Sequence, residues 1–419
     1  MSTGKWSGRL IAALVAAFAI GIVLRLLLLP TPGLRDDLDQ FVGWVHLISM
    51  NGLGTLYNPN PYGAVTFGPV MAYIWAAIAA LQPAFQVATD AADPGIRVAM
   101  KLPAVLADLG LALLVAFALR SRPGWAVVGA AVILFHPAIL DIGAWWGQYE
   151  SVYLLSGLGA VVFAIHGRNG PAAALVAVAL LTKPQAIAFV IPLAAWFWAT
   201  GGWREVLRTG AIGAIAGVVL WLPFIAASGP TNYLANVAVY QDDIFAILSL
   251  RAWNSWWLVQ EAAVGGSFIA DDVAVLGPLT LRHVGYLVTG LLQLMIAAAI
   301  IRNPRPRTLV LGLVASVLVI FAFMTQMHER YAFGAVILLV LLVAEPRMRW
   351  LSVALGAVFT LNLLAAVPPT PAIGDLLPVA GLLGVAGSVA VIAITLACLR
   401  WLAGPPSPET GAVRAQRGP

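Results

Sequence analysis

The feature that most restricts the fold of this chain is a succession of long apolar segments joined by short loops that carry arginine. Hydrophobic residues make up 61% of the 419 positions and charged residues only 10%. About 20 apolar residues in a helix span the hydrocarbon core of a bilayer, and a soluble core has no room for so many such segments. The sequence therefore predicts an all-α polytopic membrane protein.

Hydropathy predicts about 12 transmembrane helices. The first is expected to remain as an anchor, because no small-residue cleavage site follows it. Two spans are too short to cross about 30 Å of hydrocarbon alone, so we expect each to end at a polar break, at Lys183 and at His328. The expected spans, of which 172–182 and 332–344 are the short ones, lie near residues 10–29, 99–119, 126–143, 151–166, 172–182, 185–200, 206–226, 284–301, 308–325, 332–344, 350–367 and 378–399.

The positions of the arginine residues predict the orientation of the chain in the membrane. Residues 67–81 form a shorter apolar run that could either cross the bilayer or stay at its outer face. If this run crosses, nearly all the arginine-bearing loops fall outside, against the excess of Lys and Arg found in cytoplasmic loops. We therefore predict a re-entrant or horizontal helix in the first outer loop, with the N and C termini inside.

The chain is expected to be one transmembrane domain, residues 1–403, followed by a disordered cytoplasmic tail, residues 404–419. The first outer loop would be residues 30–98 and the large outer loop residues 229–283. Cys398 is the only cysteine, which excludes intrachain disulfides and multi-cysteine metal sites. The net charge of +5 follows from the arginine-bearing loops, so no nucleic-acid partner is expected.

A cluster of acids opens the first outer loop. Asp36, Asp37 and Asp39 follow the first span directly, in a chain that otherwise avoids charge. On a helix Asp37 shares a face with Phe41 and Trp44, so we expect the helix to lie along the membrane with these aromatics anchored in the interface. The acids either keep a loop solvated, or they place a carboxylate above a cavity as a general base.

Further polar groups lie at the predicted outer ends of the spans. Apolar lipid gives no reason to place them there unless they line a wet cavity, so we expect them to converge on one site. Simpler explanations stay open: Lys183 could snorkel, residues 328–330 could form a self-satisfied cap, tryptophans could form an interface belt, and Asp108 could be a buried structural acid. The candidate residues are Gln148, Glu150, Lys183, Gln185, Arg251, His328, Glu329 and Arg330.

These motifs resemble those of the GT-C superfamily, the multi-spanning glycosyltransferases that use a polyprenyl-phosphate sugar on the outer or lumenal membrane face. Lumenal glucosyltransferases of the asparagine-glycan pathway carry Asp-x-Glu-x-Gln-x-x-Trp, and Asp37-Leu-Asp-Gln-Phe-Val-Gly-Trp44 keeps its first Asp and its Trp. At the start of the re-entrant helix the family often has Tyr-Pro-Pro-Leu, whereas this chain has Thr66-Phe-Gly-Pro-Val70. The resemblance continues at residues 101–108, 146–151, 182–185 and 327–331.

The resemblance implies an inverting hexosyltransferase in the inner (plasma) membrane, with its active site on the extracytoplasmic face. It would move mannose or glucose from a polyprenyl-phosphate donor to a lipid-linked or other glycan acceptor, in contact with membrane lipids. Asp37 is the expected base, supported by Asp39 and Glu150 as catalytic residues. The expected substrate-binding residues are Asp36, Gln148, Lys183, Gln185, Arg251, His328, Glu329 and Arg330.

Two alternatives remain at this point. No cofactor is expected, although the hard oxygen ligands of Asp37, Asp39 and Glu150 could instead hold a divalent metal. An ion-coupled transporter or lipid flippase is the other functional class. Such proteins usually carry repeat symmetry and charges near the bilayer midplane, whereas here the polar groups sit at one rim and no repeat is evident.

Overall fold

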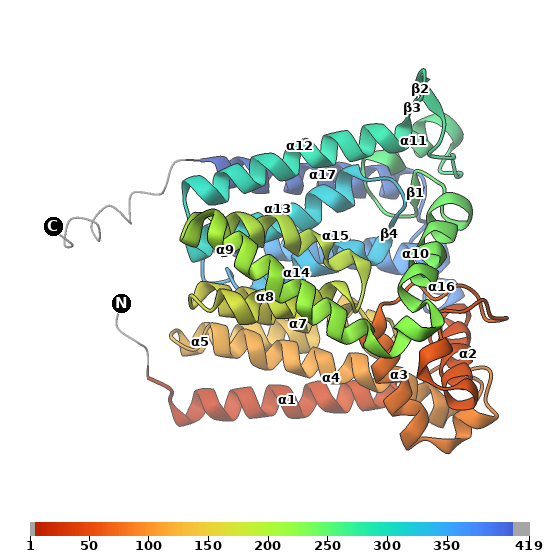
Figure 1. Cartoon of the computed structure of the whole chain (residues 1–419). Helices are drawn as coiled ribbons and strands as arrows, with labels where there is room; N and C mark the ends of the chain where they lie inside the picture. The colour runs from red at the N-terminus through yellow and green to blue at the C-terminus, as the bar shows by residue number, and fades with distance from the viewer. Residues whose placement is uncertain (1–4, 405–419) are drawn as a thin grey trace, which may run out of the picture.

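The predicted spans form one bundle of roughly parallel helices in the computed structural model, which describes residues 5–404 (Figure 1). The start of α1 and the end of α17 lie at the same end of this bundle. The bundle helices are α1 (Gly8–Leu28), α4 (Pro94–Ala118), α5 (Pro123–Phe135), α7 (Glu150–Ile165), α8 (Asn169–Leu180), α9 (Val190–Trp221), α12 (Leu281–Arg302), α13 (Pro306–Phe323), α14 (Phe333–Val340), α15 (Pro346–Ala366) and α17 (Leu382–Ala403).

A second set of elements gathers at the opposite end of the bundle, and we call it the capping layer (Figure 1). Two small strand pairs belong to it, a parallel pair of β1 (Ser249–Leu250) with β4 (Met327–His328) and an antiparallel pair of β2 (Ala274–Leu276) with β3 (Leu279–Thr280). Its helices are α2 (Arg35–Asn51), α3 (Pro69–Leu81), α10 (Gly229–Val239), α11 (Ser255–Val264) and α16 (Pro371–Leu376).

Most predicted spans coincide with a helix or with part of one, and the protein is a multi-pass, all-α membrane protein. The predicted span 126–143 instead runs over α5 and a second helical segment, 137–146, bent by 50° from it. Within residues 5–404, seven helices are long and apolar enough to cross a membrane, or up to eight if the bent pair at 123–146 is one span. The two short spans are short indeed, with 12 residues in α8 and 8 in α14. The predicted spans 185–200 and 206–226 fall in one long helical stretch, which Gly202 breaks with φ 69° and ψ −166°. The count of about 12 crossings and their direction remain predictions.

The apolar run expected to stay outside forms α3, which lies in the capping layer (Figure 1). Its first amide groups find partners on the bundle: the N–H groups of Gly68 and Val70 donate to the carbonyls of Thr182 and Leu181, at 3.2 and 3.0 Å. A side chain at Gly68 would collide with the Leu181 carbonyl, so only glycine permits this approach. Residues 66–70, which differ from the Tyr-Pro-Pro-Leu often found in the resembled family, thus join the start of α3 to the end of α8.

The aromatic-rich segment at residues 253–257, in the large loop between α9 and α12, caps the end of α13. The last carbonyls of a helix have no partner within the helix, and a buried end needs donors from elsewhere. The side chains of Asn254, Ser255 and Trp256 donate to the three carbonyls at 321–323, at 3.0, 2.6 and 2.7 Å. Trp253 and Trp256 are buried in the protein, so they are not part of an interface belt.

The capping layer has its own apolar core, distinct from the core of the bundle. Phe41 and Trp44 of α2 are both buried in it, against Phe67, Trp75 and Tyr149. The expectation that these two aromatics anchor α2 in the membrane interface is therefore wrong. The physical reason is that α3 and the loop before it cover the apolar face of α2 with protein.

Asp108 is a buried structural acid. Its carboxylate binds the Nε of Arg25 at 3.0 Å and also accepts a hydrogen bond from Ser151. Arg25 in turn donates to the carbonyls of residues 133 and 134, which end α5. This network ties α1, α4, α5 and α7 together within the bundle. The predicted disordered tail lies, beyond Gly404, outside the described residues.

Candidate active site

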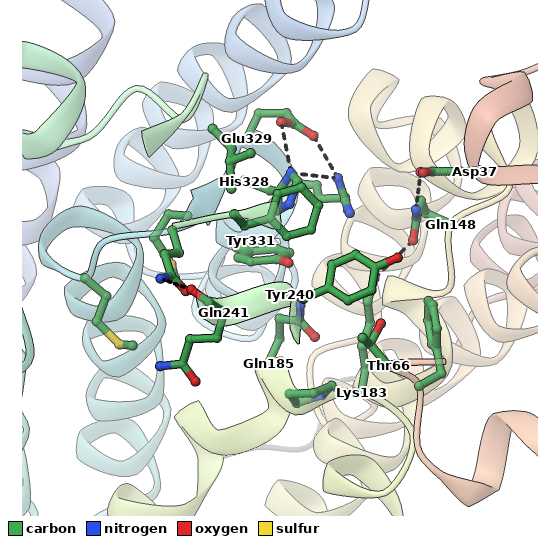
Figure 2. Close-up of a pocket in the computed structure, with 18 of the residues that line it drawn as sticks. Asp37, Thr66, Gln148, Lys183, Gln185, Tyr240, Gln241, His328, Glu329 and Tyr331 are labelled. Atoms are coloured by element: carbon green, nitrogen blue, oxygen red, sulfur yellow. Dashed lines mark hydrogen bonds and ion pairs between the residues drawn. The ribbon is translucent and has the colours of Figure 1, made fainter. Parts of the chain in front are cut away.

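A cavity of about 670 Å³ opens where the capping layer meets the ends of α8 and α13 (Figure 2). In Figure 2, Asp37 and Gln148 lie on one side of the cavity and His328, Glu329 and Tyr331 on another, with Lys183 low in the view. The predicted convergence of the polar motifs is therefore present in the fold. The predicted residues that line the cavity are Asp36, Asp37, Gln148, Lys183, Gln185, Arg251, His328, Glu329 and Arg330.

Asp37 stands on the first turn of α2 and is held through one oxygen. Its Oδ2 accepts hydrogen bonds from Trp146 Nε1 at 2.9 Å and from Gln148 Nε2 at 2.5 Å. Within the described residues, no hydrogen bond reaches its other oxygen, Oδ1. The side chain is half-buried and lines the cavity, so this carboxylate has a fixed orientation and an oxygen available to a ligand.

Behind Asp37 runs a chain of buried polar contacts. Lys183 Nζ donates to Gln148 Oε1 at 3.1 Å and to Glu150 Oε1 at 2.5 Å. Glu150 does not line the cavity, since only 1% of it is exposed and it lies beneath Lys183. Burial lowers the pKa of Lys183 to about 8, and the adjacent Glu150 carboxylate limits the drop. This lysine does not snorkel, because it points inward to protein partners.

Residues 328–330 form the facing wall. Arg330 Nη1 donates to Glu329 Oε1 at 3.1 Å, and its Nε lies 3.3 Å from Glu150 Oε1. Burial would raise the pKa of Glu329, but His328 and Arg330 outweigh it and hold that pKa at about 2. Burial and the charge on Arg330 lower the pKa of His328, so its imidazole is neutral at pH 7. The hypothesis of a self-satisfied cap holds in part, because residues 328–330 pair with one another while they also face the cavity.

Asp39 lies apart from the other acids. Its carboxylate binds the guanidinium of Arg35 at 3.0 and 3.1 Å and accepts the backbone N–H of Ala91 at 2.7 Å. It does not line the cavity. The structure therefore separates Asp37 from Asp39, and it gives Asp39 contacts that fix the start of α2.

Arg251 is the cavity-lining cation without a carboxylate partner among the described residues. It adopts a left-handed backbone, φ 61°, which is strained for a side chain other than glycine. Asn362 stabilises that turn by donating to the Arg251 carbonyl at 2.8 Å and accepting the Trp253 N–H at 3.0 Å. The side chain is exposed, with one hydrogen bond to the Ala366 carbonyl at 3.1 Å.

The cavity also has an apolar wall, built by residues from the helical turn before α9, from α13 and its end, and from the large loop. Its members are Ile187, Val237, Phe268, Val317, Ile320 and Met324. Ile187 and Phe268 are each 53% exposed, so the apolar wall continues onto the outer surface of the bundle. The site can thus accept a ligand that is polar at one end and hydrocarbon at the other.

Sequence reasoning missed three residues of the site. Trp146 was treated as part of a motif with no chemical role, and its indole N–H binds Asp37. Gln40 and Tyr240, whose side chains bond to one another at 3.1 Å, close the cavity between α2 and the large loop. The clue for Trp146 was its place beside Gln148 in a polar break, but spacing alone does not say where an indole points.

Neither the side-chain geometry nor the charges of the site suggest a metal. Across residues 5–404, no group of three or more His, Cys, Asp or Glu side chains is arranged to hold a metal ion. The three acids considered as ligands are divided among other partners. Asp39 binds Arg35, and Glu150 binds Lys183.

Comparison with solved structures finds a similar fold. No protein-family model matches the sequence, and no curated protein matches it. The fold is similar to the crystal structure of ArnT from Cupriavidus metallidurans bound to undecaprenyl phosphate, with a TM-score of 0.52 and 15% identity. The match covers 96% of this chain and 79% of that chain. At this identity the likeness establishes the fold alone.

Proposed function

We propose that this chain, whose fold is similar to that of ArnT, is a GT-C glycosyltransferase that uses a polyprenyl-phosphate-linked donor. The reaction is an inverting transfer of a hexose, mannose or glucose, to a hydroxyl of a lipid-linked or other glycan acceptor. It takes place at the extracytoplasmic face of the inner membrane. One observation carries the proposal: Asp37 presents an unengaged carboxylate oxygen to a cavity that has cations on one wall and hydrocarbon on another.

The geometry supports a single displacement. Asp37 Oδ1 takes the proton from the acceptor hydroxyl, and the acceptor oxygen forms a bond to the anomeric carbon of the donor sugar. The bond from that carbon to the phosphate oxygen breaks, and its electron pair leaves with the polyprenyl phosphate. The leaving phosphate is stabilised by positive charge, so the site needs a cation that no internal carboxylate already neutralises.

Arg251 fits that role best. Lys183 and Arg330 are each paired to buried carboxylates, whereas Arg251 is exposed at the cavity wall and has no such partner among the described residues. A guanidinium can bind two phosphate oxygens at once. His328, neutral at pH 7, lies opposite Arg251 in an antiparallel bridge and can add a hydrogen bond. Arg330 then contributes positive electrostatic potential from the facing wall of the cavity.

The hydrocarbon of the donor fits the apolar wall. The ArnT structure was determined with undecaprenyl phosphate bound, and that fold covers nearly all of this chain. In the present chain, the turn before α9 and the segment around Phe268 leave apolar side chains exposed beside the cavity. A prenyl chain can therefore lie along the bundle surface while its phosphate reaches Arg251. Burial of each CH₂ group contributes about 0.8 kcal/mol to such binding.

The remaining predicted residues divide between the acceptor and the support of the site. Asp36 and Gln185 line the cavity near Asp37 and Lys183, and we assign them to sugar hydroxyl groups. Glu150 balances the charges of Lys183 and Arg330, which would otherwise repel one another in a buried space. Asp39 fixes the first turn of α2 through Arg35 and so supports Asp37 indirectly.

The test is transfer by the purified protein. It should be reconstituted with radiolabelled polyprenyl-phosphate mannose or glucose and a membrane lipid extract, and the labelled product identified with its anomeric configuration. We expect an inverted glycoside with wild-type protein and none with Asp37→Asn. Movement of a lipid or an ion across proteoliposomes, with no glycosylated product from any donor, would instead establish the transporter or flippase class.

A further inference from the structure

We infer that Trp146 and Gln148 are positioning residues for Asp37, and that Lys183 orients the Gln148 amide instead of gripping a phosphate. The inference rests on the proposed function, because it concerns how the base of that reaction is held. It changes the role of two residues that the motif alone assigned to substrate. The argument starts from the backbone between Trp146 and Gln148.

The backbone brings two donors to the same oxygen. A π-helical turn, Asp141–Trp146, ends at Gly147, which has φ 92°. Such turns often occur at functional sites. A Cβ at Gly147 would lie 2.7 Å from a Leu38 side-chain carbon and 3.0 Å from one of Lys101. Glycine is therefore favoured here both by the positive φ and by the lack of space for a side chain. Across this bend, the side chains of Trp146 and Gln148 both end at Asp37 Oδ2.

The amide of Gln148 has only one acceptable orientation. An ammonium group can only donate and a carboxylate can only accept, so the amide oxygen must face Lys183 and the amide nitrogen must face Asp37. The contacts follow this rule, with Lys183 Nζ 3.1 Å from Oε1 and Asp37 Oδ2 2.5 Å from Nε2. Lys183 is itself fixed by Glu150 at 2.5 Å and lies over the ring of Phe67. The lysine charge is therefore committed to protein groups.

Arg330 packs against the face of the Trp146 indole and restricts its orientation. The Cζ of Arg330 lies 5.0 Å from the ring centroid, within the range of a cation–π contact. Trp146 is 1% exposed and Gln148 is 2% exposed, so neither side chain has freedom to swing into the cavity. With Oδ2 held by two buried donors, Asp37 can turn only Oδ1 toward the acceptor. Such fixed geometry is worth orders of magnitude in rate when a proton must move along one line.

The test compares pH–rate profiles of variants in the reconstituted transferase. Gln148→Glu keeps the shape of the side chain but places a second carboxylate against Asp37, and two adjacent carboxylates share a proton. We expect kcat at pH 7 to fall about 10- to 100-fold, the acid limb of the profile to move to higher pH by about one unit, and donor KM to stay within about twofold. Trp146→Phe removes one donor, and it should lower kcat about tenfold with the same sign of shift.

Gln86→Glu is the matched control. It makes the same chemical change on an exposed turn of the capping layer, away from the cavity, and should leave kcat and the profile unchanged. Thermal unfolding of each variant checks the fold. The inference is overturned if both site variants keep the wild-type kcat and profile, or if they raise donor KM with kcat unchanged. Asp37→Asn separates the two claims. Near-normal turnover of that variant rejects the proposed base, whereas its inactivity beside normal Gln148→Glu and Trp146→Phe rejects only the positioning.

Discussion

The guanidinium of Arg330 lies over the indole of Trp146, with 5.0 Å between its Cζ and the ring centroid. This contact joins the wall at residues 328–330 to the residues that hold Asp37. Arg330 is also the charge that stabilises two buried carboxylates, Glu329 at 3.1 Å and Glu150 at 3.3 Å. One side chain thus links the electrostatic balance of the site to its geometry, and several predictions can be made from it and its neighbours.

Two substitutions of Arg330 should separate the effect of its charge from the effect of its planar shape. Arg330→Lys keeps the positive charge but loses the planar fork and its stacking on Trp146, so we expect about tenfold lower kcat. Arg330→Ala leaves Glu329 and Glu150 without compensation, which should cost about 3–5 kcal/mol in unfolding free energy and nearly all activity. Turnover and thermal denaturation measure the two effects. Equal activity in the two variants would contradict this role.

Asp37→Asn should remove turnover while the protein folds and still binds its donor lipid. Asparagine is nearly isosteric but does not accept a proton at neutral pH, and loss of a general base costs about 10²–10⁴-fold in rate. Asp36→Asn is the neighbouring control and should be much milder, because Asp36 is exposed and about 100° around the helix. Comparable losses in the two variants would show that Asp37 has no special role.

Asp39→Asn tests the metal alternative together with the structural one. Because Asp39 binds Arg35 and the Ala91 N–H, its loss should lower thermal stability and reduce kcat less than loss of Asp37 does. Transfer by the wild type should be insensitive to EDTA. Activity that EDTA abolishes and that Mg²⁺ or Mn²⁺ restores would instead require a metal held by the acids of the site.

Arg251→Ala should act on the donor. If the guanidinium binds the phosphate, its removal should raise donor KM about 10- to 100-fold, as expected for a lost charged hydrogen bond of about 1.5–3 kcal/mol. Arg251→Lys should recover part of the affinity. Unchanged affinity for the polyprenyl phosphate, measured by binding of the labelled lipid, would move the phosphate site to another cation.

The stability of the protein should fall in acid because of Glu329. Its pKa is lowered from 4.5 to about 2 in the folded state, so its pairing contributes fully above pH 4.5 and is lost as the pH falls toward 2. The melting temperature should decrease over that interval, and less steeply in Glu329→Gln. A variant with the wild-type slope would show that other carboxylates dominate the acid transition.

Two isosteric cysteines can test the topology. Ser121, between α4 and α5, and Ser267, after α11, are both exposed. In a Cys398→Ser background, Ser267→Cys should react with an impermeant thiol reagent in intact cells and Ser121→Cys only after permeabilisation. The opposite pattern would mean that residues 67–81 cross, and labelling of both cysteines or of neither would contradict the whole arrangement.

The sequence was informative where a single physical rule decides the outcome. Apolar length located the spans, including the short α8 and α14, and arginine bias led to the placement of α3 outside the bundle. Polar residues at span ends were correctly expected to meet around one cavity. What the sequence could not supply was the pairing among them. Asp37 and Asp39 are two residues apart, yet Trp146 and Gln148 hold one and Arg35 holds the other.

The sequence could not predict the burial of Phe41 and Trp44, for a related reason. An aromatic face on a short helix fits a membrane surface as well as it fits a protein surface. Only the fold of residues 53–81, which lies over α2, decides between the two. The left-handed backbone of Arg251 was hidden in the same way, because Asn362, more than a hundred positions later, stabilises it.

The brevity of α8 bears on how a substrate could travel. A helix of 12 residues is about 18 Å long, so it ends well short of a full crossing, and Lys183, just beyond its end, lines the cavity. A prenyl phosphate could then slide in sideways from the surrounding leaflet without lifting its tail into water. The polyprenyl phosphate that remains after sugar transfer would leave sideways by the same route. Turnover would consequently follow the fluidity of the lipid, and stiffening the bilayer should slow the enzyme even when every catalytic group is intact.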